Sequence, residues 1–171
     1  MVRFRKTNRK FFDEAEKVFQ REKGKIMKAI LNADVQHVGS TSIPSALTKG
    51  DLDIQVRVER KDFPDAERRL SQFYQYNTGN PPTKTFLSFK DPHAKIPLGV
   101  QLTVIGSDAD DFMILRDLLR SNPNYKKQYD VLKKQFNGKS MSEYRRAKSK
   151  FFDTLRRTLE FKRLKHSISN R

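Results

Sequence analysis

The first part of the chain shows hydrophobic residues at helical spacing. Between Phe11 and Leu31 the apolar positions lie three or four residues apart, which is the period of an amphipathic helix. A short β-type run, Val35 to Val38, follows and ends at Gly39-Ser40-Thr41-Ser42. Because Ser and Thr precede Pro44, the pattern predicts a short helix over residues 43–47.

The next segments alternate in a different period. Residues 51–58 place Leu, Ile and Val at every second position between polar residues, which predicts a strand with one buried and one polar face. Residues 62–75 predict a helix, and a turn-rich stretch follows it. Two further strands, 85–89 and 98–105, flank a turn that contains Asp91 and are expected to form a hairpin.

After Gly106 the pattern is helical. Apolar positions mark one helix near residues 112–119 and a second near 125–136, and Ser140 with Glu143 forms a capping box that predicts a third helix continuing through Leu159. The order of elements predicts one α+β domain with a small mixed β-sheet packed by helices and a C-terminal helical bundle. We expect an α/β core over about 10–106, a helical region over 107–165 and a flexible tail over 166–171.

The composition narrows the class of protein. The chain has 171 residues, of which 36% are hydrophobic, and it contains 13 Phe, enough to fill one core. The absence of Cys excludes disulfides, thiol nucleophiles and Cys-ligated metal sites. No apolar run approaches the ~20 residues that span a bilayer, and residues 1–10 lack the apolar core of a signal peptide. We therefore expect a cytoplasmic protein without a membrane partner.

The charge is unevenly distributed. The formal net charge of +16 divides into +6 for residues 1–29, −2 for 30–119 and +12 for 120–171. Basic flanks around a nearly neutral centre are typical of proteins that bind nucleic acid or another polyanion. The alternative is that they are solvated faces of helices; this interpretation is favoured for any single Lys or Arg and is less satisfactory for the summed charge.

The central segment contains the residues with the clearest chemistry. Asp51 and Asp53 are two positions apart on a strand, so both carboxylates project from the same face and can bind one divalent metal ion. Gly39 and Ser40 end the preceding strand, where backbone N–H groups and a hydroxyl can hold phosphate oxygens. Together these residues predict a site for a metal-bound nucleoside triphosphate (NTP).

These motifs resemble those of the GrpB-like family in the polymerase-β-like nucleotidyltransferase superfamily. The likeness rests on residues 35–44, on the Asp51-Leu52-Asp53 triplet and on a pattern in the helical tail, and it covers about residues 10–160. The matching tail residues are Arg116, Asp117, Leu119, Pro123, Tyr129, Lys133, Tyr144, Ala147, Lys148 and Phe151.

The resemblance implies a minimal nucleotidyltransferase fold and a reaction in which a nucleotidyl group passes from an NTP to an acceptor. Asp51 and Asp53 would be catalytic and would hold Mg²⁺ or Mn²⁺. The nucleotide-binding candidates are Gly39, Ser40, Thr41, Lys49, Tyr144 and Lys148. The basic flanks favour an anionic acceptor such as RNA, or simply the nucleotide; the acceptor itself, the preferred base and the oligomeric state do not follow from the sequence.

The chain also departs from the family pattern. A Gly soon after the Pro and a Lys-Pro before the triplet are usual, whereas here Lys49 precedes Gly50. Active nucleotidyltransferases place a third carboxylate on a later strand, where this chain offers Gln101 and Thr103. The missing third carboxylate motivates an alternative to the enzyme, a catalytically inactive module of the same fold that binds nucleotide, RNA or another polyanion.

Several residues keep two interpretations. Asp91 is a candidate substitute carboxylate or an ordinary turn residue. His37 is favoured as a structural residue, and Arg57 is either near the phosphates or a surface charge. Tyr144 and Lys148 lie one helical turn apart, so they either reach a nucleotide together or divide between core and solvent.

Overall fold

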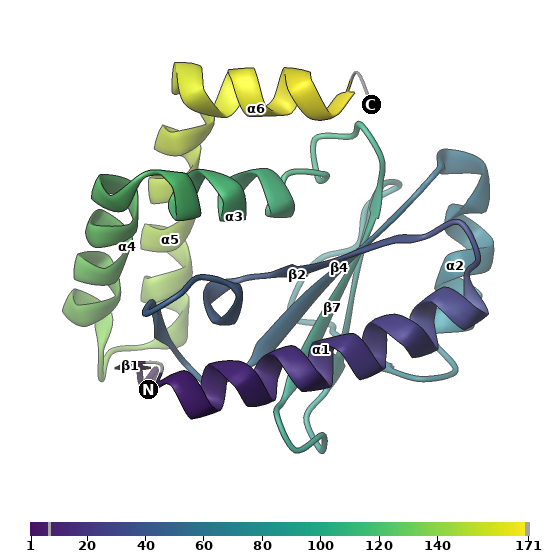
Figure 1. Cartoon of the computed structure of the whole chain (residues 1–171), viewed down its shortest axis with the longest axis horizontal. Helices are drawn as coiled ribbons and strands as arrows, with labels where there is room; N and C mark the ends of the chain where they lie inside the picture. The colour runs from purple at the N-terminus through teal and green to yellow at the C-terminus, as the bar shows by residue number, and fades with distance from the viewer. Residues whose placement is uncertain (7, 170–171) are drawn as a thin grey trace.

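The computed structural model describes residues 1–6 and 8–169. Three strands of the main sheet are long, and six α-helices occur in this part of the chain (Figure 1). The elements are β1 (Arg5–Lys6), α1 (Arg9–Ala29), β2 (Asp34–Val38), the 3₁₀ turn η1 (Ser40–Ser42), β3 (Leu47–Thr48), β4 (Leu52–Val58), η2 (Arg60–Asp62), α2 (Phe63–Leu70), β5 (Gln75–Tyr76), β6 (Phe86–Asp91), β7 (Leu98–Val104), α3 (Phe112–Ser121), α4 (Pro123–Phe136), α5 (Met141–Arg156) and α6 (Leu159–Ser169).

The main sheet has the strand order β2-β4-β7-β6-β5. β4 and β7 run parallel at its centre, and the other neighbours are antiparallel. The parallel pair places Asp53 opposite Gly99, while the antiparallel pair places Asp53 opposite Val38. The expected mixed sheet therefore forms. It brings the last residue of β2 next to the first residues of β4 and β7, at one end of these strands.

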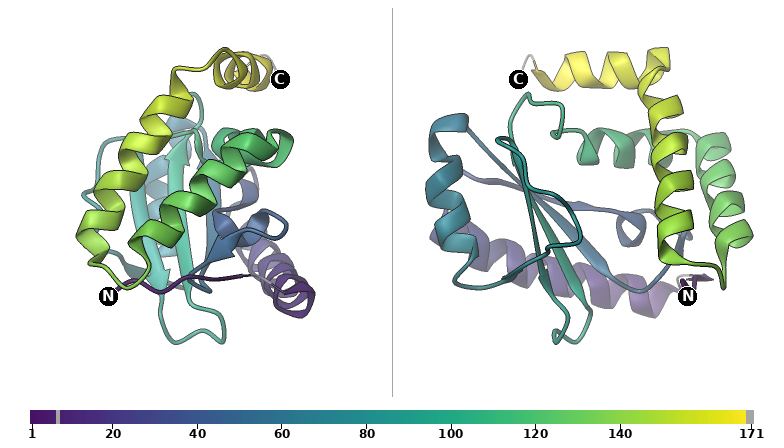
Figure 2. Two further views of the ribbon diagram at one scale, coloured as in Figure 1. Left: turned by 90° about the vertical axis from the view of Figure 1, so that its left-hand side faces the viewer. Right: turned by 180° about the vertical axis from the view of Figure 1, so that it is seen from behind.

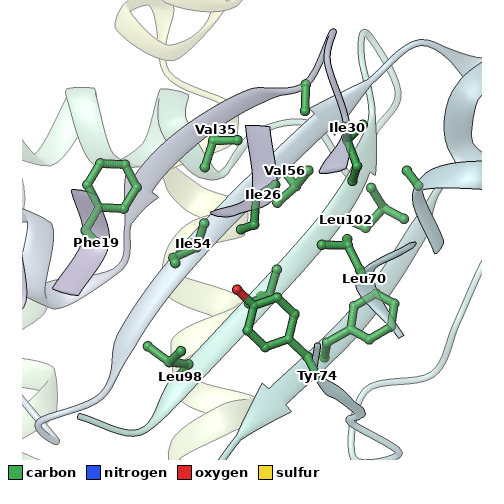
Figure 3. Close-up of a cluster of buried hydrophobic side chains, with 14 of the residues drawn as sticks. Phe19, Ile26, Ile30, Val35, Ile54, Val56, Leu70, Tyr74, Leu98 and Leu102 are labelled. Atoms are coloured by element: carbon green, nitrogen blue, oxygen red, sulfur yellow. The ribbon is translucent and has the colours of Figure 1, made fainter. Parts of the chain in front are cut away.

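One face of the sheet packs against α1 and α2 and forms the larger hydrophobic core (Figure 3). Ile26 of α1, Ile54 of β4 and Leu70 of α2 are fully buried there. Burial of such a side chain contributes roughly 1.5–3 kcal/mol. This core holds the sheet rigidly, so residues on the opposite face are fixed in position.

The C-terminal helices form a second core of their own. Leu118 of α3, Tyr129 of α4, Leu155 of α5 and Phe161 of α6 are buried in it. Figure 2 shows that these helices stand as a separate layer beside the sheet, away from α1. The expected C-terminal helical bundle is confirmed.

The first residues attach to this bundle. The backbone of Val2 exchanges hydrogen bonds with Lys139 and Gly138 in the turn between α4 and α5, and Phe4 N–H donates to Asn137 Oδ1 at 2.9 Å. β1 then pairs with β3 as a separate two-stranded sheet.

Several sequence-based expectations differ from the structure. The short helix predicted over 43–47 is wrong: the turn closes earlier, over Ser40–Ser42, and Leu47–Thr48 pairs with β1. The helix predicted over 62–75 ends at Leu70, because Gln75–Tyr76 joins β6 as an edge strand.

The last predicted helix is two helices. α5 ends at Arg156, and Thr158 Oγ1 accepts a hydrogen bond from Phe161 N–H at 3.2 Å, which starts α6. The capping box of Ser140 and Glu143 is present as predicted. Residues 166–169, expected in a flexible tail, are the end of α6, and residues 170–171 lie outside the described residues.

Within the described ranges, no helix combines the length and apolar character needed to cross a bilayer.

Candidate functional site

A cavity of about 500 Å³ lies between the sheet and the C-terminal helices. Its wall includes the turn after β2, the beginnings of β4 and β7, and side chains from α3 and α5. Seven of the eight residues expected to form the site line it, namely Gly39, Ser40, Lys49, Asp51, Asp53, Tyr144 and Lys148.

Asp53 is held between two glycines. Gly39 has φ +72°, a conformation that glycine adopts without strain, and a Cβ there would overlap Asp53 Oδ2. A Cβ at Gly99, on the neighbouring strand β7, would lie 2.7 Å from Asp53 Oδ1. The two missing side chains therefore make the space that the carboxylate occupies.

Asp51 lies just before β4 and lines the same cavity. Its Oδ2 pairs with Lys49 Nζ at 2.8 Å, and both side chains remain about one-third exposed. Lys49 thus orients the carboxylate of Asp51, one of the two predicted metal ligands. The charged groups of Lys49 and Asp51 both remain accessible from the cavity.

Ser40 is positioned by Lys133, a fully buried residue of α4. Lys133 Nζ donates to Ser40 Oγ at 2.8 Å and to the Leu47 carbonyl oxygen at 2.6 Å. It lies 3.8 Å from the Tyr129 ring centroid and 3.7 Å from Asp130. Burial lowers the pKa of Lys133 to about 7. Lys133 thereby joins the helical bundle to the Gly39–Ser40 turn.

Tyr144 and Lys148 both face the cavity from α5. Tyr144 is buried, its hydroxyl lies 3.0 Å from that of Tyr129, and its ring packs edge-on against Phe4 at 4.9 Å between centroids. Lys148 is exposed and is near enough to Asp53 to favour its ionised form. The structure thus brings both residues to the cavity.

The electrostatics of the cavity combine a cationic wall with a carboxylate pair. Six Lys and Arg side chains line it against three carboxylates, those of Asp51, Asp53 and Asp111. Burial, and then the charge of Asp51, raise the pKa of Asp53 to about 6, while Lys148, Lys49 and a hydrogen bond from Gln101 oppose this. A divalent cation beside the two carboxylates would favour the ionised form of Asp53.

The donor set fits magnesium that arrives with a nucleotide. Mg²⁺ prefers oxygen ligands and is usually held by one or two carboxylates together with substrate phosphates and water. Asp51 and Asp53 supply two such carboxylates on one wall. Among residues 1–6 and 8–169, no cluster of three or more His, Cys, Asp or Glu side chains has a geometry that would hold a metal by itself.

Thr41 is the one expected site residue that the structure places elsewhere. It is fully buried, and its Oγ1 lies 3.1 Å from His37 Nε2, while His37 Nδ1 lies 2.9 Å from Glu16 Oε2. His37 stacks on Phe19 of α1 with 5.0 Å between ring centroids, and burial lowers its pKa. These contacts agree with a structural role for His37.

Arg57 neither lines the cavity nor lies at the surface. It is buried and pairs with both carboxylate oxygens of Asp110, at 2.6 and 2.7 Å, and with Asp34 at 2.6 Å. Gln55 Nε2 donates to the same Asp110 at 3.0 Å. The face of β4 that was expected to be polar and exposed is therefore buried at the positions after Asp53, namely Gln55 and Arg57.

Asp91 acts within its own turn, where its carboxylate accepts hydrogen bonds from the backbone N–H groups of His93 and Ala94.

Two further cavity residues were not among the site residues expected from the sequence, although Gln101 was noted at the position of a third carboxylate. Gln101 lines the cavity and hydrogen-bonds Asp53, and Asp111 pairs with Arg156 at 2.6 Å. A glycine inside a strand often marks a position that another group approaches closely, so Gly99 was a signal in the sequence that a side chain, here that of Asp53, lies against β7. Lys133 does not line the cavity and acts through Ser40; it follows Tyr129 by four residues, which places it beside the apolar stripe of its helix.

Sequence comparison identifies one family over most of the chain. The family model described as GrpB protein matches residues 11–158. A UPF0157 protein of Vibrio cholerae serotype O1 is 33% identical over 139 residues, which cover 81% of this chain and 73% of that protein.

Structure comparison agrees with this result. The crystal structure of GrpB from Enterococcus faecalis has a TM-score of 0.71 and 20% identity, and the match covers 96% of this chain and 98% of that one. Cid1, described as having RNA terminal uridylyl transferase activity, has a TM-score of 0.51 and 12% identity over 75% of this chain and 40% of its own. These likenesses confirm the expected nucleotidyltransferase-like fold.

Proposed function

The chain belongs to the GrpB protein family, and from this membership and the cavity geometry we propose that it is a metal-dependent nucleotidyltransferase. It would transfer a nucleotidyl group from a Mg²⁺- or Mn²⁺-bound NTP to an acceptor. One observation carries the proposal: Asp51 and Asp53 share a single cavity with the Gly39–Ser40 turn and with Lys148.

Each of these residues has a defined task. Asp51 and Asp53 hold the metal, which when bound neutralises phosphate charge and orients the reacting oxygens. Gly39 and Ser40 offer backbone N–H groups and a hydroxyl to the triphosphate. Lys49 and Lys148 supply positive charge at the same wall, and Tyr144 closes the cavity beside them.

The positive wall supports an anionic acceptor. Six cations against three carboxylates leave an excess of three positive charges around the cavity. RNA is one acceptor of this kind, and Cid1, which shares the fold, is described as acting on RNA. Anionic ligands would also approach faster through such a field.

Nucleotide binding and transfer are tested separately. We expect MgNTP to raise the melting temperature of the wild type, because a ligand of the native state stabilises it by mass action, and to have no effect on the Asp51→Asn/Asp53→Asn double variant. The matched control Asp13→Asn/Asp108→Asn removes two exposed carboxylates outside the cavity and should respond like the wild type. Transfer of label from NTP to RNA that is unchanged in the first variant would refute catalysis by these residues.

Gln101 favours a second candidate function, a non-catalytic module that binds RNA or another polyanion. An amide stands beside Asp53 on β7, where active members of the superfamily are expected to carry a carboxylate. Such a module would bind polyanions with a steep salt dependence and without any effect of NTP or of Asp51→Asn.

A further inference from the structure

Three cations of the cavity wall have no acidic partner in the described part of the chain. Lys49, Arg116 and Arg156 each pair with a carboxylate, whereas Lys90, Arg145 and Lys148 make no ion pair. Charges without an internal partner, gathered around one cavity, are available to bind an anion.

Lys90 occupies a defined place relative to Asp53. The register of the sheet sets Asp53 opposite Gly99 on β7, and Gly99 opposite Lys90 on β6. Directly paired residues project from the same face, so Lys90 and Asp53 lie on one face, about two strand spacings or ~10 Å apart. The residue between them is a glycine, so no side chain of its own separates Lys90 from Asp53 Oδ1 and Gln101 Nε2, which lie over it.

Arg145 approaches this part of the cavity from α5. Its guanidinium lies against the turn before β6, where a Cβ at Gly79 would be 3.7 Å from Arg145 Nη1. Asn77 and Asn80 of this turn also line the cavity. Arg145 and Lys90 thus reach the cavity from its helical wall and from the sheet, and Lys148 lies nearer Asp53.

Two other polar side chains of the cavity, Asp111 and Gln101, are poorly suited to receive a proton from an acceptor hydroxyl. Under the proposed function Asp51 and Asp53 hold the metal. Asp111 is buried and paired with Arg156 at 2.6 Å, and Gln101 is an amide that hydrogen-bonds Asp53. These residues suit a nucleophile that is already ionised at neutral pH.

We infer that the acceptor is a phosphate monoester, bound in the cavity between Asp53 and Lys90 and held by Lys90 and Arg145. This inference rests on the proposed nucleotidyl transfer and specifies its second substrate. The phosphate belongs either to the end of a nucleic acid or to a small metabolite, and the two sources present the same chemical group.

The reaction balances without a general base. An oxygen of the acceptor phosphate attacks the α-phosphorus of the NTP, and a new P–O bond forms. The bond between the α-phosphorus and the oxygen bridging to the β-phosphorus breaks, and pyrophosphate leaves with the electron pair. No proton has to be removed from the nucleophile, because the second pKa of a phosphate monoester is about 6. The product is a phosphoanhydride.

The first test measures acceptor binding in the presence of Mg²⁺ and the α,β-methylene analogue of ATP. The probes are two matched pairs: a 5′-phosphorylated and a 5′-hydroxyl RNA hexamer, and ribose 5-phosphate and ribose. We expect the phosphorylated member of at least one pair to bind about tenfold more tightly than its partner, as expected for charge-assisted hydrogen bonds. The pair that shows the preference identifies the source of the phosphate.

Charge variants connect this preference to the cavity. Lys90→Met/Arg145→Met should abolish it and leave the Kd for the Mg²⁺-bound ATP analogue unchanged, because neither residue is assigned to the nucleotide. Lys127→Met/Lys150→Met removes the same charge from exposed positions outside the cavity and should retain the preference. Equal binding within both pairs, or a preference that survives in the first variant, would overturn the inference.

Product analysis separates this inference from the proposed function. Label that enters a phosphatase-resistant phosphoanhydride supports both. Label that enters the 5′-hydroxyl RNA equally well leaves nucleotidyl transfer intact and overturns the phosphate acceptor. A wild type that binds no MgNTP overturns the proposed function, and the acceptor inference with it.

Discussion

The contact between Gly99 and Asp53 allows a sharp test of the metal site. A Cβ on residue 99 would lie 2.7 Å from Asp53 Oδ1, and ordinary contacts of a Cβ begin at 3.4 Å, so Gly99→Ala requires the carboxylate to move by about 0.7 Å. Gln101 Nε2, 3.3 Å from the same Cβ, hinders movement of the strand in compensation. The substitution therefore displaces a proposed metal ligand without removing it.

The expected result is a loss of binding without a loss of folding. Mutation of residues that hold a metal ligand in place typically lowers metal affinity by 10- to 100-fold. The Kd for MgNTP should therefore rise by roughly that factor. Alanine in a strand is favoured over glycine by about 0.5–1 kcal/mol, which offsets part of the strain. The free energy of unfolding should therefore stay within about 1 kcal/mol of the wild type.

The assay is titration of a fluorescent NTP in Mg²⁺, paired with urea denaturation. Gly24→Ala in α1 is the matched control, because nothing lies within 4 Å of a Cβ at that position. It should gain about 1 kcal/mol of helix stability and bind MgNTP normally. If Gly99→Ala binds MgNTP with wild-type affinity, Asp53 is not a metal ligand in this position and the reasoning fails.

Three further predictions concern other parts of the molecule. Arg57→Met should cost about 3–5 kcal/mol in urea denaturation, because it leaves the buried carboxylate of Asp110 without its counter-ion; a cost below about 1 kcal/mol would contradict this. Ser140→Ala should lower the free energy of unfolding by about 1 kcal/mol through loss of the capping box, and Ser142→Ala, inside the same helix, should change it much less. His37 has a pKa lowered by burial, so between its folded pKa and ~6.5 the unfolded chain binds more protons and stability rises with pH. Wild-type stability should therefore fall on acidification from pH 7 to 5 more than that of His37→Gln, and equal slopes would refute the assignment.

The sequence predicted those elements whose structure depends on neighbouring residues in the chain. The alternation of Leu52, Ile54 and Val56 predicted β4 to within one residue, and the Ser140 capping box predicted the start of α5. Gly39-Ser40 and the Asp51–Asp53 pair are close in sequence, so their place in one cavity also followed from spacing.

Distant partners explain what the sequence left open. The strand β3 forms because Leu47–Thr48 meets Arg5–Lys6, about 40 residues earlier. Arg57 is buried because Asp110, 53 residues later, covers it. The same holds in the site, where Lys133 reaches Ser40 across 93 residues. Periodicity carries no information about such pairings, and they decide which charges remain exposed.

The contact between Phe4 and Tyr144 has a consequence for how the protein is made. A ribosome extends the chain from its N-terminus, so residues 2–6 emerge long before the turn at 137–139 and the helix that holds Tyr144. The core of α1, α2 and the sheet is complete by Val104, whereas the cavity wall needs α5. A nascent chain that ends before residue 141 would lack the part of the cavity wall that α5 supplies, so nucleotide binding should appear only as the last helices dock.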